Sequence, residues 1–190
     1  MREDIIKSFA KINLSLGVLG KHNKNLHRIE TLVSFIDLND QIKIKKIEQA
    51  NHKVMFQGKF SKKIYKNNTV TELLNILDKQ HLINNQKYQI IINKKIPSKA
   101  GLGGGSMNAS AILNYLLKKN KKTVSEKKLA QICNKIGSDV ILGLKKKNSI
   151  LLGNGKLIRS QSKLKLYTLI LKPGFGCSTK VLYKEIKHYS

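Results

Sequence analysis

The chain has 190 residues, enough to bury a core in one large domain or in one domain and part of another. A hydrophobic fraction of 41% and clear periodic segments exclude a disordered chain, and the apolar runs are too short for a transmembrane helix. The N-terminus begins without a signal-peptide pattern, so the sequence predicts a soluble, cytoplasmic protein.

The formal net charge is +26, and basic surfaces can bind nucleic-acid phosphates by releasing counterions. All but three of the 37 basic residues are lysine, and the lysines are spread along the chain among many asparagines and isoleucines. No recognised nucleic-acid motif accompanies them. The charge therefore indicates compositional drift, and we expect neither a specific nucleic-acid partner nor a membrane partner.

The two cysteines give no sign of a disulfide or a metal site. Cys133 and Cys177 are far apart in the sequence and lack CxxC or Cys/His ligand spacing. We expect both to be reduced thiols, with no disulfide framework and no zinc site.

The N-terminal part of the chain has the pattern of a β layer. Apolar residues alternate with polar or small ones over residues 11–18, which predicts a half-buried strand. Lys11 and Asn13 would then share the face opposite the apolar side chains. The alternating apolar residues are Ile12, Leu14, Leu16 and Val18.

Further elements follow from periodicity and turn signals. Strands are predicted at residues 27–36, 41–47, 88–92, 149–152 and 166–171, with turns at 21–25 and 37–40. Apolar residues at helical spacing predict one helix capped by Asn68 or Thr69, a second that starts at Ser106, and a third that starts near Ser125 and ends at Gly137.

A glycine-rich segment, IPSKAGLGGGS at residues 96–106, lies between a predicted strand and a predicted helix. Glycines let several backbone N–H groups point into one site, and the helix adds its positive N-terminal end, so this order predicts a phosphate-binding loop. Ser106 could cap the helix or offer its hydroxyl to a phosphate or to a phosphate-bound Mg²⁺. The alternative is a flexible loop before a capped helix. The segment matches neither the Walker A pattern nor GxGxxG.

The segment at residues 97–106 resembles the signature loop of the GHMP kinases, the superfamily of galactokinase, homoserine kinase and mevalonate kinase. Three other blocks follow the same family order: AKINL at residues 10–14, His27 with the segments that follow it, and GSDV at residues 137–140. Within the superfamily these blocks are most similar to the kinases of 4-diphosphocytidyl-2-C-methyl-D-erythritol.

The resemblance implies an α+β fold with two parts. Residues 1–160 would form the GHMP kinase N-terminal, ATP-binding domain, and residues 161–190 would begin a ferredoxin-like C-terminal domain. Family members continue through that second domain, so we expect this chain to lack most of it.

The resemblance also implies an activity: transfer of the ATP γ-phosphoryl group to the 2-hydroxyl of this cytidyl diphosphate sugar alcohol, in the non-mevalonate route to isopentenyl diphosphate. Asp139 corresponds to the family's proton acceptor, and Lys11 to the lysine that helps to orient or polarise the hydroxyl. From local sequence alone, Asp139 could equally be a turn aspartate and Lys11 a surface lysine.

The resemblance also implies ligand-binding residues, each at the position of this sequence that matches the family pattern. On the substrate side, His27 would bind the cytosine, Asn13 would reach the erythritol, and Thr179 and Tyr183 would complete the pocket. Helix capping, an exposed strand histidine and simple packing are the alternatives for Asn68, His27 and Tyr183. Mg²⁺ would accompany ATP, with no protein ligand assigned beyond a possible Ser106. The ATP-binding residues would be Pro97, Gly101, Leu102, Gly103, Gly104, Gly105 and Ser106, with Asn68 near the adenine.

Two other functions stay open on the sequence. One is another GHMP small-molecule kinase, of the homoserine or mevalonate type, against which His27 argues. The other is a noncatalytic basic protein that binds nucleotide or nucleic acid. In addition, Leu26 stands where the family has an aromatic residue, which removes a stacking contact of about 1–3 kcal/mol.

Overall fold

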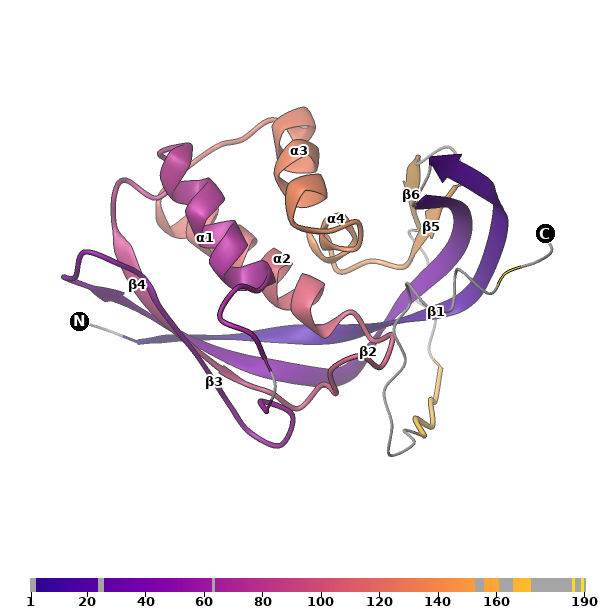
Figure 1. Ribbon diagram of the computed structural model, residues 1–190, viewed down its shortest axis with the longest axis horizontal. Coiled ribbons are helices and arrows are strands. Elements are labelled where there is room, and N and C mark those ends of the chain that lie inside the picture. The colour runs from indigo at the N-terminus through magenta and orange to yellow at the C-terminus, as the bar shows by residue number, and fades with distance from the viewer. Residues whose placement is uncertain are drawn as a thin grey trace.

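The computed structural model describes residues 3–23, 26–62, 64–152, 156–160, 166–171, 186 and 189. In this part of the chain, six strands form one mixed sheet, and helices cover one side of it (Figure 1). The strands are β1 (Asp4–Asn23), β2 (Leu26–Ile47), β3 (Lys53–Gln57), β4 (Lys87–Asn93), β5 (Ser149–Leu151) and β6 (Leu157–Arg159). The helices are α1 (Thr69–Lys79), α2 (Gly104–Lys119), α3 (Glu126–Ile136) and α4 (Val140–Gly143).

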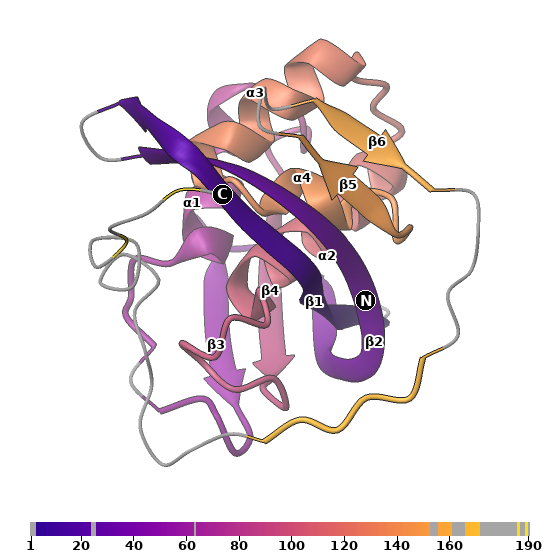
Figure 2. The same ribbon diagram turned by 90° about the vertical axis from the view of Figure 1, so that its right-hand side faces the viewer.

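β2 is the strand that the rest of the sheet shares. It pairs antiparallel with β1 along most of its length, with β4 over residues 41–47, and with β5 over residues 31–33. β3 adds to β4 in parallel and β6 adds to β5 antiparallel. Figure 2 shows β1 and β2 as a long curved hairpin, with β3 and β4 near one part of β2 and β5 and β6 near another.

The turn predicted at residues 37–40 is wrong, because β2 continues through it. Asp40 lies in the ladder opposite Ser8, and its side chain is fully buried. The pairing with β1 is interrupted at residues 36–38, where the register shifts, and it resumes at Asn39, so the turn-favouring Asp and Asn residues do not end the strand. The strands predicted at 27–36 and 41–47 are therefore one strand. In the turn predicted at 21–25, residues 24 and 25 lie outside the described residues.

The strand predicted at 11–18 is confirmed as the middle of β1, but its faces differ from the simple pattern. Leu14 and Leu16 are 39% and 44% exposed, whereas Lys11 is only 6% exposed. The register with β2 shifts after Asn13, which marks a β-bulge. The bulge breaks the alternation on which the apolar-face prediction depended.

The other strand predictions have mixed outcomes. The strands at 88–92 and 149–152 are confirmed as β4 and β5, while β3 and β6 were not predicted. Residues 166–171 form no strand, and their side chains are exposed. Most of the second domain expected at 161–190 lies outside the described residues, so its boundary stays a prediction.

The helix ends follow local chemistry with one exception. Asn68 caps α1 in a capping box, Ser125 caps α3, and Gly137 ends α3, as predicted. The predicted start at Ser106 is wrong, since α2 begins two residues earlier and Ser106 lies in its first turn. The N-cap is Gly103, whose left-handed φ of 66° turns the chain into the helix.

The main core lies between the sheet and the helices. Cys133 belongs to it, and burial raises the pKa of this thiol to about 11, so it acts as an apolar packing group. Cys177 lies outside the described residues. The largest side chains of the core are Tyr88, Ile42, Ile44, Leu73, Leu74, Leu77, Ile83, Ile90, Ile92, Ile112 and Leu113.

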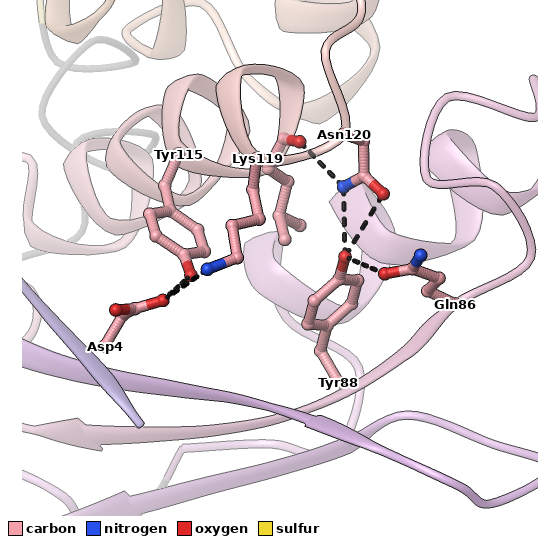
Figure 3. A network of polar contacts seen from close by, with 7 residues as sticks. Asp4, Gln86, Tyr88, Tyr115, Lys119 and Asn120 are labelled. Carbon is pink, nitrogen blue, oxygen red and sulfur yellow. Dashed lines mark hydrogen bonds and ion pairs between the residues drawn. The ribbon is translucent and has the colours of Figure 1, made fainter. Parts of the chain in front are cut away.

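Two polar clusters fix the C-terminal end of α2 to the sheet (Figure 3). The Tyr115 hydroxyl donates to Asp4 at 2.5 Å, and the Lys119 ammonium lies 2.9 Å from the same carboxylate. Beside them, Asn120 donates to the buried Tyr88 hydroxyl at 3.0 Å. Burial raises the pKa of both tyrosines, so both stay protonated donors.

Replacing Tyr88 by Phe should destabilise the protein by about 1–3 kcal/mol, because the buried Asn120 amide loses its bonds to the hydroxyl and keeps only its bond to the Leu116 carbonyl. Urea unfolding measures the loss. Tyr115→Phe is the control: its partner Asp4 is partly exposed and can turn to water, so the loss should be smaller. An equal loss from both changes would contradict this assignment.

His52 should make the fold less stable at mildly acidic pH. Burial lowers its pKa below the ordinary value of 6.5, although Asp78 opposes the shift. Its Nδ1 accepts the Tyr88 N–H at 3.1 Å, a bond that protonation breaks. The unfolded chain thus binds the proton more readily, so stability falls as pH drops below about 6.5. Urea unfolding at several pH values should show a weaker pH dependence of the free energy of unfolding in His52→Asn. The control His81→Asn changes an exposed histidine and should keep the original pH dependence.

Candidate active site

The structure brings Lys11 and Asp139 together, as predicted. The Lys11 Nζ lies 3.3 Å from the Asp139 Oδ2, and the Asp139 side chain is 35% exposed. Asp139 precedes α4 but makes no side-chain capping bond to it. Asp139 does lie in a turn, as the alternative expects, but its carboxylate faces the lysine. Its role as a base stays a prediction.

Lys11 also lies directly against the glycine loop. Its backbone N–H donates to the Leu102 carbonyl at 3.1 Å. A methyl group on Gly103 would lie 2.8 Å from the Lys11 Cγ and 3.1 Å from its Cε. Only a residue without a side chain therefore allows the lysine stem to pass. The Leu102 side chain packs in a small core with Ala10 and Ile96, which anchors this part of the loop.

The loop has the backbone geometry of an anion site. Lys99, Gly101 and Gly103 alternate along it with positive φ values of 54°, 71° and 66°. The first N–H groups of α2 have no partner within the helix, and its first turn holds no acidic residue. A methyl group on Gly137 would lie 3.8 Å from the Ser106 hydroxyl, so the start of α2 lies close to the segment that leads to Asp139.

A buried carboxylate that the sequence predictions missed holds both ends of this loop. Asp40 accepts hydrogen bonds from the backbone N–H groups of Lys95 at 2.7 Å and Ile96 at 2.8 Å, and from the Asn108 amide at 3.0 Å. It also pairs with the Lys94 ammonium. Lys95 and Ile96 lead into the loop and Asn108 follows it, so Asp40 ties the entry and the exit of the loop to β2.

α1 contacts the loop from the other side. The Thr69 hydroxyl donates to the Gly105 carbonyl at 3.0 Å. Asn68 uses its amide oxygen to cap α1 and its amide nitrogen to bond the carbonyls of Tyr65 and Lys66, so the capping alternative describes its observed contacts. A groove of about 490 Å³ between β3 and α1 is lined in part by Asn68. Contact of Asn68 with adenine stays a prediction.

The residues predicted to bind substrate are only partly described. Asn13 shares a face with Lys11, as predicted, and accepts a hydrogen bond from the lysine at 2.6 Å. His27 lies on β2, and Thr31 lies four residues along, roughly 13 Å away on the same face of the strand. Thr179 and Tyr183 lie outside the described residues.

The described residues contain no group of three or more His, Cys, Asp or Glu side chains that could hold a metal ion. Mg²⁺ commonly keeps several waters and is held by phosphate oxygens with one or two protein ligands. The donor set here, with the Ser106 hydroxyl at the start of α2, fits a cation that arrives with a phosphate ligand and does not fit a resident metal centre.

Residues 68–146, which include the glycine loop and Asp139, match the family model described as GHMP kinases N terminal domain. A 4-diphosphocytidyl-2-C-methyl-D-erythritol kinase from Pelagibacter ubique (strain HTCC1062) is 50% identical over 185 residues, covering 97% of this chain and 66% of the relative. One from Petrotoga mobilis (strain DSM 10674 / SJ95) is 34% identical over 182 residues, covering 95% and 68%. This chain belongs to the 4-diphosphocytidyl-2-C-methyl-D-erythritol kinase family.

The fold of this family member agrees with a solved relative. A crystal structure of 4-(cytidine 5'-diphospho)-2C-methyl-D-erythritol kinase superposes with a TM-score of 0.71 at 23% identity, covering 97% of this chain and 65% of that one. The chain thus spans about two thirds of the length of the relatives that it matches. The predicted superfamily and α+β fold class are confirmed.

In this family member, Gly103→Ala should destabilise the fold more than Gly101→Ala. Each alanine must adopt a positive φ, which costs about 1–2 kcal/mol. Only the alanine at 103 also collides with the Lys11 stem, because nothing lies within 4 Å of a methyl group at 101. Urea unfolding of the two variants measures the difference. Equal losses would mean that Lys11 moves aside freely and that the contact does not hold it.

Proposed function

We propose that this chain transfers the γ-phosphoryl group of ATP to the 2-hydroxyl of 4-diphosphocytidyl-2-C-methyl-D-erythritol, a step of the non-mevalonate route to isopentenyl diphosphate. The observation that carries the proposal is the contact of Lys11 with both Asp139 and the glycine loop. In this arrangement a base and its lysine partner would lie beside the phosphates of ATP. The 50% identity to the Pelagibacter ubique kinase supports the choice of substrate.

Asp139 would act as the general base. The substrate oxygen attacks the γ-phosphorus, its proton passes to the Asp139 carboxylate, and the bond between the γ-phosphorus and the bridging oxygen breaks to release ADP. Lys11, 3.3 Å from this carboxylate, would orient the hydroxyl and face the charge that develops on the transferring group. Most of the acceleration in such a transfer comes from positioning and charge, and both residues are held by strand and loop contacts.

ATP would bind with its phosphates on the loop, through backbone groups of residues 101–106 and beside Pro97. The adenosine would extend past Asn68 into the groove between β3 and α1. The bond from Thr69 to Gly105 holds the start of α1 against the loop. Mg²⁺, held mainly by the phosphates with Ser106 as the protein donor, would supply charge neutralisation when bound.

The cytidyl end of the substrate would lie toward the end of the β1–β2 hairpin. His27 would read the cytosine; it lies roughly 13 Å along β2 from Thr31, a separation suited to an elongated nucleoside diphosphate ester. Asn13 would meet the sugar alcohol next to Lys11. Thr179 and Tyr183 are proposed to complete this pocket on the strength of the family pattern.

Location and partners follow from the proposed chemistry. An enzyme that consumes ATP works where ATP is abundant, so we propose a cytoplasmic enzyme with a small-molecule substrate and no specific nucleic-acid partner. Among the helices that the structure describes, none has the length and apolar character needed to cross a membrane.

Asp139→Asn should lower kcat by about 10²–10⁴-fold and leave ADP binding unchanged, because it removes the base and keeps the shape of the site. The measurement is ADP release with ATP, Mg²⁺ and the cytidyl substrate. Asp37→Asn, which changes an exposed aspartate elsewhere on β2, is the control and should keep full turnover.

Two results would contradict the proposal. ADP release that does not need the cytidyl substrate, or that survives Asp139→Asn, would show a different reaction. Absence of turnover with ADP binding retained would favour a noncatalytic nucleotide-binding protein.

A further inference from the structure

A chain of hydrogen bonds runs from the Lys11 ammonium into the sheet. Lys11 Nζ donates to Asn13 Oδ1, Asn13 Nδ2 donates to Thr31 Oγ1, and the Thr31 hydroxyl donates to the Ser15 carbonyl, each at 2.6 Å. Thr31 is 2% exposed and lies on β2 where that strand pairs with both β1 and β5. This series of hydrogen bonds therefore starts at the Lys11–Asp139 pair and ends at the backbone of β1.

The direction of these bonds fixes the orientation of the Asn13 amide. A hydroxyl has one proton, and Thr31 gives it to the Ser15 carbonyl, so Thr31 can only accept from Asn13. The NH₂ end of the amide must then face Thr31, and the oxygen must face Lys11, whose ammonium can only donate. A flipped amide would set NH₂ against the ammonium and oxygen against a hydroxyl lone pair.

The β-bulge in β1 provides the end point of the chain. The pairing register with β2 shifts between Asn13 and Ser15, which locally breaks the ladder of backbone hydrogen bonds. At this break the Thr31 hydroxyl donates to the Ser15 carbonyl. The irregularity that breaks the apolar alternation of this strand thus also anchors the side chain next to Lys11.

We propose that Thr31 is a positioning residue of the active site: its hydroxyl sets the Asn13 amide and thereby holds the Lys11 ammonium beside Asp139. This role rests on the proposed function, in which Lys11 and Asp139 act on the substrate hydroxyl. With its oxygen on Lys11 and one N–H on Thr31, Asn13 keeps one N–H to donate to the substrate.

The test compares Thr31→Val, which keeps the shape and removes the hydroxyl, with Thr31→Ser, which keeps the hydroxyl. Thr31→Val should lower kcat about 10- to 100-fold, since small misplacements of reacting groups have effects of this size. The KM for ATP should change less than about twofold, because the loop contacts are untouched. Thr31→Ser should recover most of kcat. A Ser variant as impaired as the Val variant would show that packing, and not the hydroxyl, matters, and would overturn the proposal.

A second measurement does not depend on turnover. The Asn13 side-chain NH₂ signals, identified in ¹⁵N spectra by their loss in Asn13→Ala, should exchange slowly with solvent in the original chain and in Thr31→Ser, and fast in Thr31→Val. Unchanged protection in Thr31→Val would overturn the proposal whatever the kinetics show. If the original chain has no turnover, the proposed function fails and with it the catalytic part of this role, and the exchange result then decides whether the Thr31 hydroxyl sets the Asn13 amide.

Discussion

The packing of the Lys11 stem against the backbone of Gly103 is the contact on which the candidate site depends. A methyl group at this glycine would lie 2.8 Å from the lysine Cγ, so strand and loop approach each other only because no side chain intervenes. The approach lets the ammonium reach Asp139 at 3.3 Å. A phosphate on the loop and a hydroxyl beside the carboxylate would then be neighbours, as in-line transfer requires.

The glycine loop owes its placement to anchors at both ends of α2. At the loop end, the buried Asp40 carboxylate holds the N–H groups of Lys95 and Ile96 and the Asn108 amide. At the far end, roughly 24 Å along the helix, the Tyr88 cluster fixes Asn120 to β4. Buried ion pairs such as Asp40 with Lys94 add little net stability. We interpret the Asp40–Lys94 pair as an interaction that holds the glycine loop in one conformation.

Sequence reasoning succeeded where the deciding chemistry is local and failed where it is not. The cap at Asn68 and the Lys11–Asn13 face follow from a few adjacent residues, and both are confirmed. Asp40 was missed because turn propensity is local, whereas its burial comes from pairing with β1 and β4. One signal was available: antiparallel pairing of the predicted strands 41–47 and 88–92 would already have set Asp40 beside Lys94. The bulge after Asn13 has no comparable signal in the sequence.

The identity of the phosphorylated product tests the proposed function most directly. The chain would be incubated with ATP, Mg²⁺ and 4-diphosphocytidyl-2-C-methyl-D-erythritol, and the products followed by ³¹P NMR. We predict a new phosphomonoester signal, equal in amount to the ADP formed, on a molecule that keeps its diphosphate signals. ADP accompanied by inorganic phosphate alone, or a phosphomonoester formed equally well from homoserine or mevalonate, would contradict the function that we assign to Lys11 and Asp139.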